Sequence, residues 1–506
     1  MWPARLSDVA QYLGMQTLRP ELAQIQIEAL STDSRKVGSG ELFVAIRGET
    51  HDGHSYVESA LKQGAVAALV EKAWLASNTH LTDRCLPVEN TTSAMRELGR
   101  VFRSQFKFPV IAVGGSNGKT TTKEMLACLL GALKAPITRT HKSENGFLGL
   151  AITLTQRSHR TTSSPAALVA EIGIDEVGAM AEHVAIATPD IALLTALGPE
   201  HLAGLGSWDT AVEEELILFR KAPTHCRRIW QLAEPRLKAI LNELRAGDIL
   251  VGDSLTLAQI SAPVKLKIDA AELSVLSYEL TDQRATHTSL QVTWTPARAE
   301  SKKNKWSHSF KIPLPGLHNA QNFALALATS ALLCENHLDL ANAWSSFVPP
   351  EMRSRIIELK HGITLYDDCY NASPASMDAA FDALLSHEWK AQHKILVLGD
   401  MLDLGEESKS WHLNLITKLL KIENSDLCLF GSAMYDVYNE IKINHSDALR
   451  AGNIQLRHAG PEVNPASFLD ALRDQLPGSV VLVKGSRGMD LGRFVKSCEA
   501  WSSAQG

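Results

Sequence analysis

Short apolar runs alternate with longer amphipathic stretches along most of the chain. In the middle third, residues 110–113, 167–172 and 191–197 form strand-like runs that helical patterns separate. A parallel sheet with crossover helices produces this alternation, because its strands are buried on both faces. The runs at 394–398 and 479–483 repeat the arrangement in the last third. The pattern therefore predicts an α/β protein with a second, smaller α/β unit near its C-terminus.

Two further strand-like segments lie between these units. Residues 289–295 and 308–314 alternate between apolar and polar side chains, as the strands of a half-buried sheet do. The charged segment 296–306 separates them. We therefore expect a β-hairpin with a solvated tip.

The length of 506 residues corresponds to about three domains of ordinary size. A polar helical stretch ends near 106–109, where an apolar run begins. Farther on, Pro349 and Pro350 stop a helical pattern and favour an extended connection. The sequence thus predicts domains over residues 1–107, 108–348 and 349–506.

The composition narrows the class of protein. Hydrophobic residues make up 45% of the chain and charged residues 21%, which is typical of a folded globular protein and not of a disordered or collagen-like one. The formal charge of -6, without a long basic run, gives no electrostatic support for a nucleic-acid or anionic-membrane surface. We therefore expect small-molecule chemistry and no nucleic-acid partner.

Compartment signals are also informative. No apolar run approaches the roughly 18–20 residues of a spanning helix, and Arg5 and Asp8 interrupt any apolar core of a signal peptide. The 7 cysteines contain no CxxC pair, which favours reduced thiols over a disulfide framework or a zinc site. These features predict a cytoplasmic protein without membrane insertion.

The strongest chemical signal is the segment 110–122, Val-Ile-Ala-Val-Gly-Gly-Ser-Asn-Gly-Lys-Thr-Thr-Thr. In a strand–loop–helix of this kind, successive backbone N–H groups face a phosphate, Lys119 neutralises it and the Thr120 hydroxyl can bind Mg²⁺. Val113 stands where the general pattern has glycine, and an ordinary glycine-rich turn is the alternative. The candidate nucleotide-binding residues here are Gly115, Ser116, Asn117, Gly118, Lys119, Thr120 and Thr121.

Two polar residues follow neighbouring apolar runs. Glu171 ends one run and His201 comes after another, so both should lie at the carboxyl edge of the parallel sheet, where ligands of open α/β sheets bind. A carboxylate and an imidazole can both bind a divalent cation. Taken alone, each would more often be a hydrogen-bonded structural residue.

The form Gly-Ser-Asn-Gly-Lys-Thr-Thr resembles the shortened phosphate-binding loop of the Mur ligases, the ATP-dependent amide ligases of peptidoglycan assembly. Further segments resemble this family in the same order, and the similarity covers essentially the whole chain. These segments are 33–35, 40–48, 52–54, 169–207, 314–322, 367–374, 398–405 and 483–487. The resemblance implies three α/β domains, ATP and Mg²⁺, and a ligase joining D-alanyl-D-alanine to a UDP-N-acetylmuramoyl-tripeptide through an acyl phosphate.

The resemblance also implies roles for individual residues. The implied catalytic residues are Lys119, Glu171, His201 and Arg353. The implied magnesium ligands are Thr120, Glu171 and His201. Asn319 and Asn322 would contact the nucleotide base, Arg353 the γ-phosphate and Asp367 the ribose. The UDP-sugar site would be lined or shaped by Ser34, Arg35, Phe43, Gly48 and His54, and the incoming dipeptide held near Asp368, Tyr370, Asn371, Lys484 and Arg487.

Simpler interpretations of several of these residues stay open. His318 or Asn319 could cap a helix rather than meet a base. Arg353 and Asp367 could be surface charges, and Lys484 and Arg487 a solvated basic loop.

The chain departs from the family pattern at three places. Residues 144–151 and 229–234 differ from the usual motifs, so no contacts are carried over from them. Glu215 stands where the family usually has a lysine that CO₂ converts to a carbamate. A glutamate has the same charge but a shorter reach, and the helical repeat turns Glu213 and Glu214 to other faces. We therefore expect Glu215 as a further magnesium ligand, with a solvated acidic face of three glutamates as the alternative.

Together these features predict a three-domain ATP-dependent ligase, expected to be a monomer. In the mechanism that the resemblance implies, no side chain acts as a nucleophile. A Mur-type ligase for a different acid or amine is the nearest alternative. A catalytically silent nucleotide-binding partner is the alternative from another class, motivated by the three departures.

Overall fold

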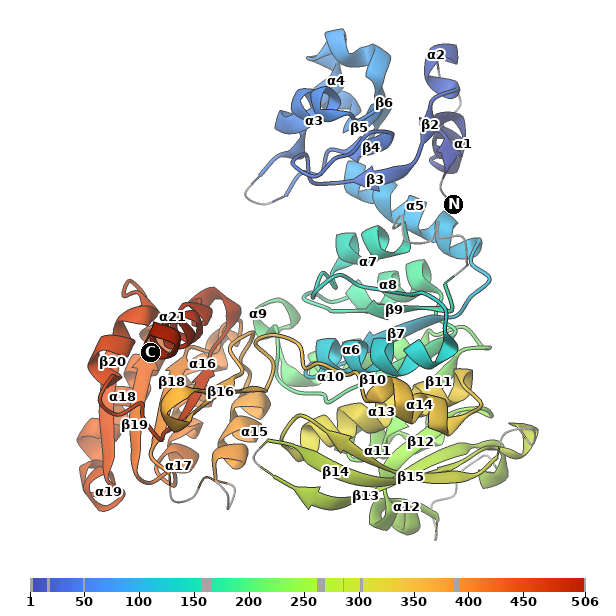
Figure 1. Cartoon of the computed structure of the whole chain (residues 1–506). Coiled ribbons are helices and arrows are strands. Elements are labelled where there is room, and N and C mark those ends of the chain that lie inside the picture. The colour runs from blue at the N-terminus through green and yellow to red at the C-terminus, as the bar shows by residue number, and fades with distance from the viewer. Residues whose placement is uncertain are drawn as a thin grey trace.

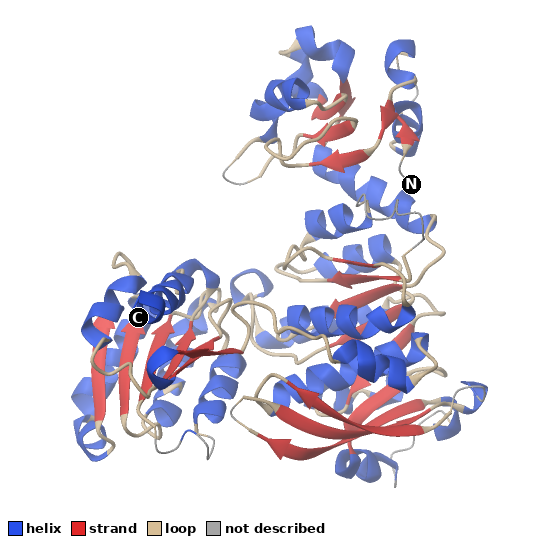
Figure 2. Cartoon of the chain, viewed as in Figure 1, coloured by secondary structure: helices blue, strands red, loops and turns tan. Residues whose placement is uncertain are grey.

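The computed structural model describes residues 3–15, 19–48, 51–155, 165–261, 269–284, 286–300, 304–385, 389 and 392–504. Three main sheets follow one another along the chain (Figure 1). Each lies within one of the three expected ranges, and the exact boundaries stay a prediction. Figure 2 shows the strands as three separate groups with helices around each. The predicted α/β class is confirmed.

The N-terminal unit holds a small parallel sheet. Its strands, in spatial order, are β3 (Ala29–Ser31), β4 (Glu41–Val44), β5 (Ala67–Glu71) and β6 (Cys85–Val88). A short antiparallel pair stands beside it, β1 (Ala4–Arg5) with β2 (Gln26–Ile27). The helices of this unit are α1 (Leu6–Tyr12), α2 (Pro20–Ala23), α3 (Val57–Gln63), α4 (Lys72–Ala76) and α5 (Thr91–Ser104).

Helix α5 connects the first unit to the second. The Asn90 side chain caps it by accepting from the Ser93 N–H at 2.8 Å. Its apolar face then packs onto the central unit, where a Cβ added at Gly99 would lie 3.2 Å from the Ala151 backbone. One hydrophobic core consequently runs from the first sheet through α5 into the central sheet.

The central sheet has nine strands within the described residues, and seven of them pair in parallel with at least one neighbour. Their spatial order is β15 (Trp306–Ile312), β14 (Thr288–Thr295), β13 (Ser274–Gln283), β12 (Ile249–Asp253), β11 (Arg227–Gln231), β10 (Ile191–Leu194), β7 (Val110–Gly114), β9 (Ala167–Glu171) and β8 (Ile137–Arg139). All pairs from β13 to β8 are parallel, whereas β13, β14 and β15 pair in antiparallel fashion.

Helices cover both faces of this sheet because its strands are apolar on both sides. In β7, Val110 and Ala112 face one core while Ile111 and Val113 face the other. The helices of the unit are α6 (Lys119–Leu129), α7 (Phe147–Leu154), α8 (Ala179–Ala187), α9 (Leu202–Leu205), α10 (Trp208–Arg220), α11 (Pro235–Ala239), α12 (Ser254–Ser261), α13 (Leu317–Leu333) and α14 (His337–Trp344). The long helix α13 packs beside α6 on one face.

The predicted hairpin is confirmed in β14 and β15, and the sequence missed the neighbouring strand β13. Its tip is less solvated than expected. Ala297 and Trp306 are buried, and Glu300 forms an ion pair with Arg227 of β11. The apolar ends and this ion pair fold the tip back onto the sheet; residues 301–303 of the expected tip lie outside the described residues.

The C-terminal unit is a second parallel sheet with one antiparallel edge. Its order is β16 (Arg355–Leu359), β17 (Ile363–Asp367), β21 (Val480–Lys484), β18 (Lys394–Gly399), β19 (Ser425–Phe430) and β20 (Ile454–Ala459), with β16 antiparallel to β17. The helices are α15 (Pro374–Leu384), α16 (Ser408–Asn414), α17 (Ile416–Leu419), α18 (Ser432–Asn444), α19 (Ser446–Ala451), α20 (Phe468–Leu472) and α21 (Gly492–Ala504).

The C-terminal unit lies against the central unit near α9 (Figure 1). The N–H of Ala203 donates to the carbonyl of Asp403 at 3.4 Å, and the Ser373 hydroxyl donates to Asn117 Oδ1 at 2.8 Å. Among the described residues no helix is long and apolar enough to cross a membrane. The seven cysteines all lie in the described part of the chain and form no disulfide bond.

Candidate active site

The phosphate-loop candidate has the geometry that its sequence predicts. It follows β7 and ends at α6, with Gly115 and Gly118 at φ of 110° and 89°. A Cβ on Gly115 would lie 2.3 Å from the Thr195 hydroxyl, so glycine is required there. The Ser116 hydroxyl donates to the Gly198 carbonyl and accepts from the Gly198 N–H, both at 2.9 Å. These bonds fix the loop against the segment that follows β10.

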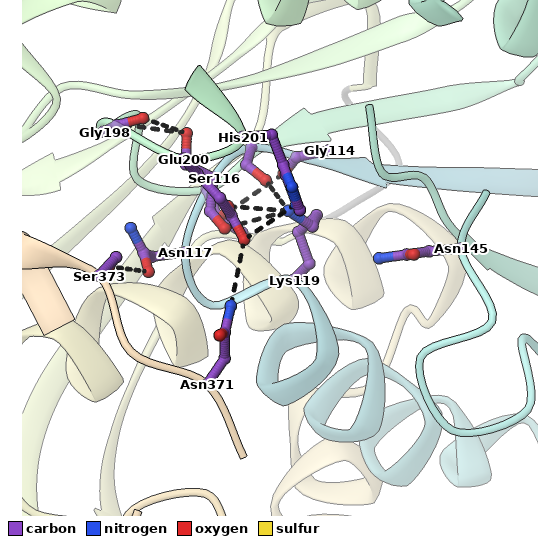
Figure 3. A network of polar contacts seen from close by, with 12 residues as sticks. Gly114, Ser116, Asn117, Lys119, Asn145, Gly198, Glu200, His201, Asn371 and Ser373 are labelled. Atoms are coloured by element: carbon purple, nitrogen blue, oxygen red, sulfur yellow. Dashed lines mark hydrogen bonds and ion pairs between the residues drawn. The ribbon is translucent and has the colours of Figure 1, made fainter. Parts of the chain in front are cut away.

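Lys119 projects into the centre of this loop (Figure 3). Its ammonium donates to the carbonyls of Gly115 and Ser116 and lies 3.5 Å from Glu200 Oε2. Burial alone would lower the pKa of Lys119, but the carboxylates of Glu200, Glu215 and Glu171 raise it above its usual range. The lysine is therefore a fixed positive charge at the start of α6.

Two of the expected magnesium ligands meet beside Lys119. The Thr120 hydroxyl donates to Glu171 Oε1 at 2.9 Å, and Glu171 is only 1% exposed at the end of β9. Asn145, in one of the segments that depart from the family pattern, also donates to Glu171 Oε1, at 3.0 Å. This departure therefore leaves a contact to the carboxylate in place.

His201 lines a cavity between the central and C-terminal units together with Thr120 and Glu171, but no hydrogen bond joins it to Glu171. Its backbone has the left-handed φ of 53° at the start of α9. The ring lies 3.6 Å from Glu200 Oε1 and 4.0 Å from Asp403 Oδ2 of the C-terminal unit. His201 thus stands where the two units meet.

Glu215 lies behind the phosphate loop. Its Oε2 accepts from the Gly115 N–H at 2.8 Å, and Glu215 is absent from the residues that line the cavity. The alternative of a solvated acidic face is wrong, because Glu214 and Glu215 are both buried on α10. Glu214 caps α8 by accepting from the N–H groups of Gly178 and Met180. The short side chain of Glu215 thus contacts the backbone of the phosphate loop. We had expected it to contact a magnesium ion instead.

Burial raises the pKa of Glu215 to about 7, although Lys119 and the Gly115 amide oppose the shift. Such a carboxyl contributes stability below its unfolded pKa of about 4.5, and this contribution is lost as pH rises toward 7. We expect Glu215→Gln, which keeps an acceptor oxygen, to raise Tm by about 2 °C or more near pH 8 and to have a smaller effect near pH 5. Thermal melts at the two pH values test this.

Glu213→Gln is the matched control, since Glu213 lies on the same helix with its side chain 64% exposed. Its effect on Tm should be the same at both pH values. An equally pH-independent effect of Glu215→Gln would contradict the raised pKa.

The two asparagines expected to contact the nucleotide base, Asn319 and Asn322, lie on α13. Helix α13 begins at Leu317 behind Gly316, whose φ is 92°, so neither His318 nor Asn319 is its cap. The Asn319 amide donates to the Pro315 carbonyl at 2.8 Å. The Asn322 amide packs against Gly118, where an added Cβ would lie 2.6 Å from its Oδ1. Both asparagines line the cavity.

Arg353 reaches across from the C-terminal unit. Its Nη2 donates to the Thr120 hydroxyl at 3.0 Å and to the Ser143 hydroxyl at 3.4 Å. Its guanidinium carbon lies 3.9 Å from the centre of the Tyr370 ring, and that of Arg487 lies 5.6 Å from the same ring. Stacking on Tyr370 therefore directs one guanidinium at the phosphate loop.

The two neighbouring aspartates at the end of β17, Asp367 and Asp368, have different surroundings. Asp367 is buried, accepts from the Met352 N–H and the Cys369 thiol, and does not line the cavity. Burial raises its pKa. Both carboxylate oxygens of Asp367 are hydrogen-bonded inside the C-terminal unit, so this arrangement leaves neither of them for the expected contact with a ribose.

Asp368, the next residue, faces the cavity. Its Oδ2 lies 2.6 Å from the buried ammonium of Lys484, which also donates to the Asn371 carbonyl at 3.2 Å. Lys484 is thus an internal clamp of this loop, and the alternative of a solvated basic loop is wrong for it. The Asn371 amide donates to Glu200 Oε1 at 3.5 Å across the boundary between the units (Figure 3).

These groups surround one cavity of about 410 Å³. Its lining from the central unit includes Ser116, Asn117, Gly118, Lys119, Thr120, Thr121, Glu171, Glu200, His201, Asn319 and Asn322. Its lining from the C-terminal unit includes Arg353, Asp368, Tyr370, Asn371, Lys484 and Arg487. Most of the predicted site residues are therefore brought together between two parallel sheets.

The expected UDP-sugar residues lie in the N-terminal unit, away from this cavity. Phe43 belongs to a hydrophobic core, and His54 is buried with Nδ1 2.7 Å from Asp52 Oδ1 and Nε2 accepting from the Glu71 N–H. These two shape the unit from inside. Arg35 is exposed beside Asp33, and the Gly48 N–H donates to the His51 carbonyl at 2.9 Å. Ser34 is partly exposed.

Sequence reasoning missed four side chains that contact Asn117, Lys119, Thr120 or Glu171. They are Lys123, Ser143, Glu200 and Ser373. The spacing of Lys119 and Lys123, four residues apart on a helix, was a signal that could have placed both on one face. The other three lie in loops, where no periodic pattern indicates direction.

Family models for the three Mur ligase domains match most of the chain. The model described as "Mur ligase family, catalytic domain" matches residues 26–103, "Mur ligase middle domain" matches 113–330, and "Mur ligase, glutamate ligase domain" matches 352–487. The three matches follow one another in the order of the three sheets.

Individual relatives extend this similarity along the chain. The UDP-N-acetylmuramoyl-tripeptide–D-alanyl-D-alanine ligase of Escherichia coli is 30% identical over 77% of this chain and 78% of its own. That of Bacillus subtilis is 27% identical over 97% of both. A crystal structure of MurF from Acinetobacter baumannii superposes with a TM-score of 0.72 at 23% identity, covering 98% of this chain and 99% of its own. The last comparison shows the shared fold.

Proposed function

This chain belongs to the Mur ligase family, and we propose on that premise that it joins D-alanyl-D-alanine to UDP-N-acetylmuramoyl-tripeptide with conversion of ATP to ADP and phosphate. Relatives that carry this activity in their names align with nearly the full chain. The observation that carries the proposal within the site is the meeting of Lys119, Glu171 and Arg353 in one cavity between two units. A phosphate-binding loop and an arginine from another domain are the parts that phosphoryl transfer needs.

In the proposed reaction the terminal carboxylate of the tripeptide attacks the γ-phosphorus of ATP. A carboxylate oxygen–phosphorus bond forms, the bond to the β,γ-bridging oxygen breaks, and ADP leaves. The amine of the dipeptide then attacks the acyl carbon, phosphate leaves, and the amine loses a proton. Lys119 and the loop N–H groups hold the phosphates, and Arg353 adds positive charge where the transferring group develops charge.

Mg²⁺ would be held by the Thr120 hydroxyl and the Glu171 carboxylate, with His201 on the same cavity wall. Oxygen donors beside a phosphate loop suit this ion, which is usually bound by one or two protein ligands together with substrate phosphates. Among the described residues no group of three or more His, Cys, Asp or Glu side chains is placed to hold a metal ion. The ion supplies charge neutralisation for the phosphates.

The remaining substrate contacts are assigned by position. We assign the base to the face of Asn319 and Asn322, the dipeptide to the loop of Asp368, Tyr370 and Asn371, and the UDP-sugar to the N-terminal unit. The domains over residues 1–107, 108–348 and 349–506 would thus bind the UDP-substrate, ATP and the dipeptide, respectively. Monomeric state, a cytoplasmic location and the lack of a nucleic-acid partner stay predictions.

The choice of amine separates this proposal from its alternatives. With ATP, Mg²⁺ and UDP-N-acetylmuramoyl-tripeptide, we expect phosphate release to depend on D-alanyl-D-alanine. The rate should fall at least about tenfold with D-alanine or L-amino acids, because a single amino acid lacks the second residue that the polar groups of the proposed dipeptide loop would bind. Equal rates with a single amino acid would indicate a Mur-type ligase for another amine. Tight ATP binding without phosphate release under every condition would indicate the silent nucleotide-binding partner.

A further inference from the structure

A second lysine on α6 is enclosed completely beneath the candidate site. Lys123, one turn after Lys119, has no exposed surface. Its Nζ lies 3.2 Å from Glu171 Oε2 and 3.4 Å from Glu124 Oε1, and it donates to the Lys142 carbonyl. A buried cation persists only when charged and polar partners surround it in this way. Lys123 therefore links α6, the end of β9 and the segment 140–145.

The two oxygens of Glu171 have different neighbours. Oε2 forms the ion pair with Lys123 and is buried without a hydrogen-bond partner among the described residues, whereas Oε1 accepts from Thr120 and Asn145. The ammonium of Lys123 thus sets which oxygen points away from the loop. Glu171 Oε1 is left on the side of Thr120, which lines the cavity.

The segment 140–145 is fixed by the same lysine. The Lys142 carbonyl accepts from Lys123, and Lys142 has the left-handed φ of 49°. On either side of it, the Thr140 hydroxyl accepts from the Glu171 N–H at 3.0 Å, and the Ser143 hydroxyl lies 2.9 Å from the Thr120 hydroxyl. Removing the ammonium would release the carboxylate and this segment together.

We propose that Lys123 is a positioning residue for the divalent cation: its buried ammonium orients the Glu171 carboxylate and holds the 140–145 segment against Thr120. This inference rests on the cation site of the proposed function. Residues that orient a metal ligand through a second contact commonly change metal affinity by about 10- to 100-fold when replaced. Lys123 touches neither the cation nor the nucleotide in this role.

The test measures Mn²⁺ binding in the presence of ADP, with free Mn²⁺ followed by electron paramagnetic resonance. In Lys123→Met we expect the Mn²⁺ dissociation constant to rise about tenfold or more. Glu124→Gln is the matched control, because Glu124 lies near the same ammonium but is also paired with Arg139 at 3.0 Å. Its dissociation constant should stay within about threefold of the wild type.

Lys123→Arg is a second test variant, needed if Lys123→Met does not fold. It keeps the positive charge but changes the length and shape of the side chain that carries it. We expect a loss of Mn²⁺ affinity of more than about threefold in this variant as well. A smaller change in every folded Lys123 variant, even with a lowered Tm, would assign the lysine to stability alone and overturn the proposal. The assay contains no peptide substrate, so failure of the proposed ligase activity would not affect its outcome.

Discussion

Lys119→Ala is expected to lower the rate of phosphate release about 10³-fold while the protein stays folded. Lys119 places a fixed charge between Gly115, Ser116 and Glu200, and its raised pKa keeps that charge in place over the working pH range. Its removal takes away the main cation that the central unit offers to a transferring phosphoryl group. Rates are measured at saturating substrates, with Tm recorded in parallel.

Lys62→Ala is the control for Lys119→Ala. Lys62 lies on α3 with its side chain 79% exposed and pairs with Glu58 on the same helix, so its removal should change neither rate nor Tm appreciably. Retention of more than about a tenth of the wild-type rate by Lys119→Ala would count against the phosphate-loop assignment.

Arg353→Lys should lower the rate by about 10²-fold or more, although the charge is kept. The guanidinium is stacked on Tyr370 at 3.9 Å and still reaches the Thr120 hydroxyl at 3.0 Å. A lysine has neither the planar face for the ring nor the fork for a phosphate. The rate of phosphate release at saturating ATP separates this loss from weaker nucleotide binding.

Arg493→Lys provides the comparison, because the Arg493 side chain is 61% exposed on α21 and pairs with Asp490, three residues earlier in the chain. It should behave as wild type. If Arg353→Lys kept a third or so of the wild-type rate, the contact across the two units would be a packing contact and not part of phosphoryl transfer.

The sequence predicted correctly that Glu171 lies at the carboxyl edge of the central sheet, because this edge is set by where the strands end. Glu171 is the last residue of β9, beside β7, and this follows from two apolar runs and the rule that parallel strands share a carboxyl edge. The hairpin of β14 and β15 was equally readable from its alternation.

Side-chain direction was harder to predict. Asp367 and Asp368 are neighbours at the end of β17, and consecutive side chains of an extended chain point to opposite sides. One carboxylate therefore turns into the C-terminal unit and the other into the cavity, a choice that the dipeptide Asp-Asp does not reveal.

The length of a side chain was a second feature that made its contacts hard to predict. The alignment of Glu215 with a longer modified side chain gives its place on α10 but not its partner. The short carboxylate ends at the Gly115 N–H, and no rule of spacing predicts a contact 100 residues away in the chain. Lys123 was missed because a charged residue on a helix is usually solvated.

Transfer of oxygen from the tripeptide to phosphate tests the central claim most directly. The tripeptide substrate, labelled with ¹⁸O in its terminal carboxylate, is incubated with ATP, Mg²⁺, D-alanyl-D-alanine and the wild-type protein, and phosphate and peptide are analysed by mass spectrometry. An acyl phosphate requires that the phosphate carry one ¹⁸O and that the UDP-muramoyl-pentapeptide form in equal amount. Phosphate without label, or phosphate released without pentapeptide, would contradict the account.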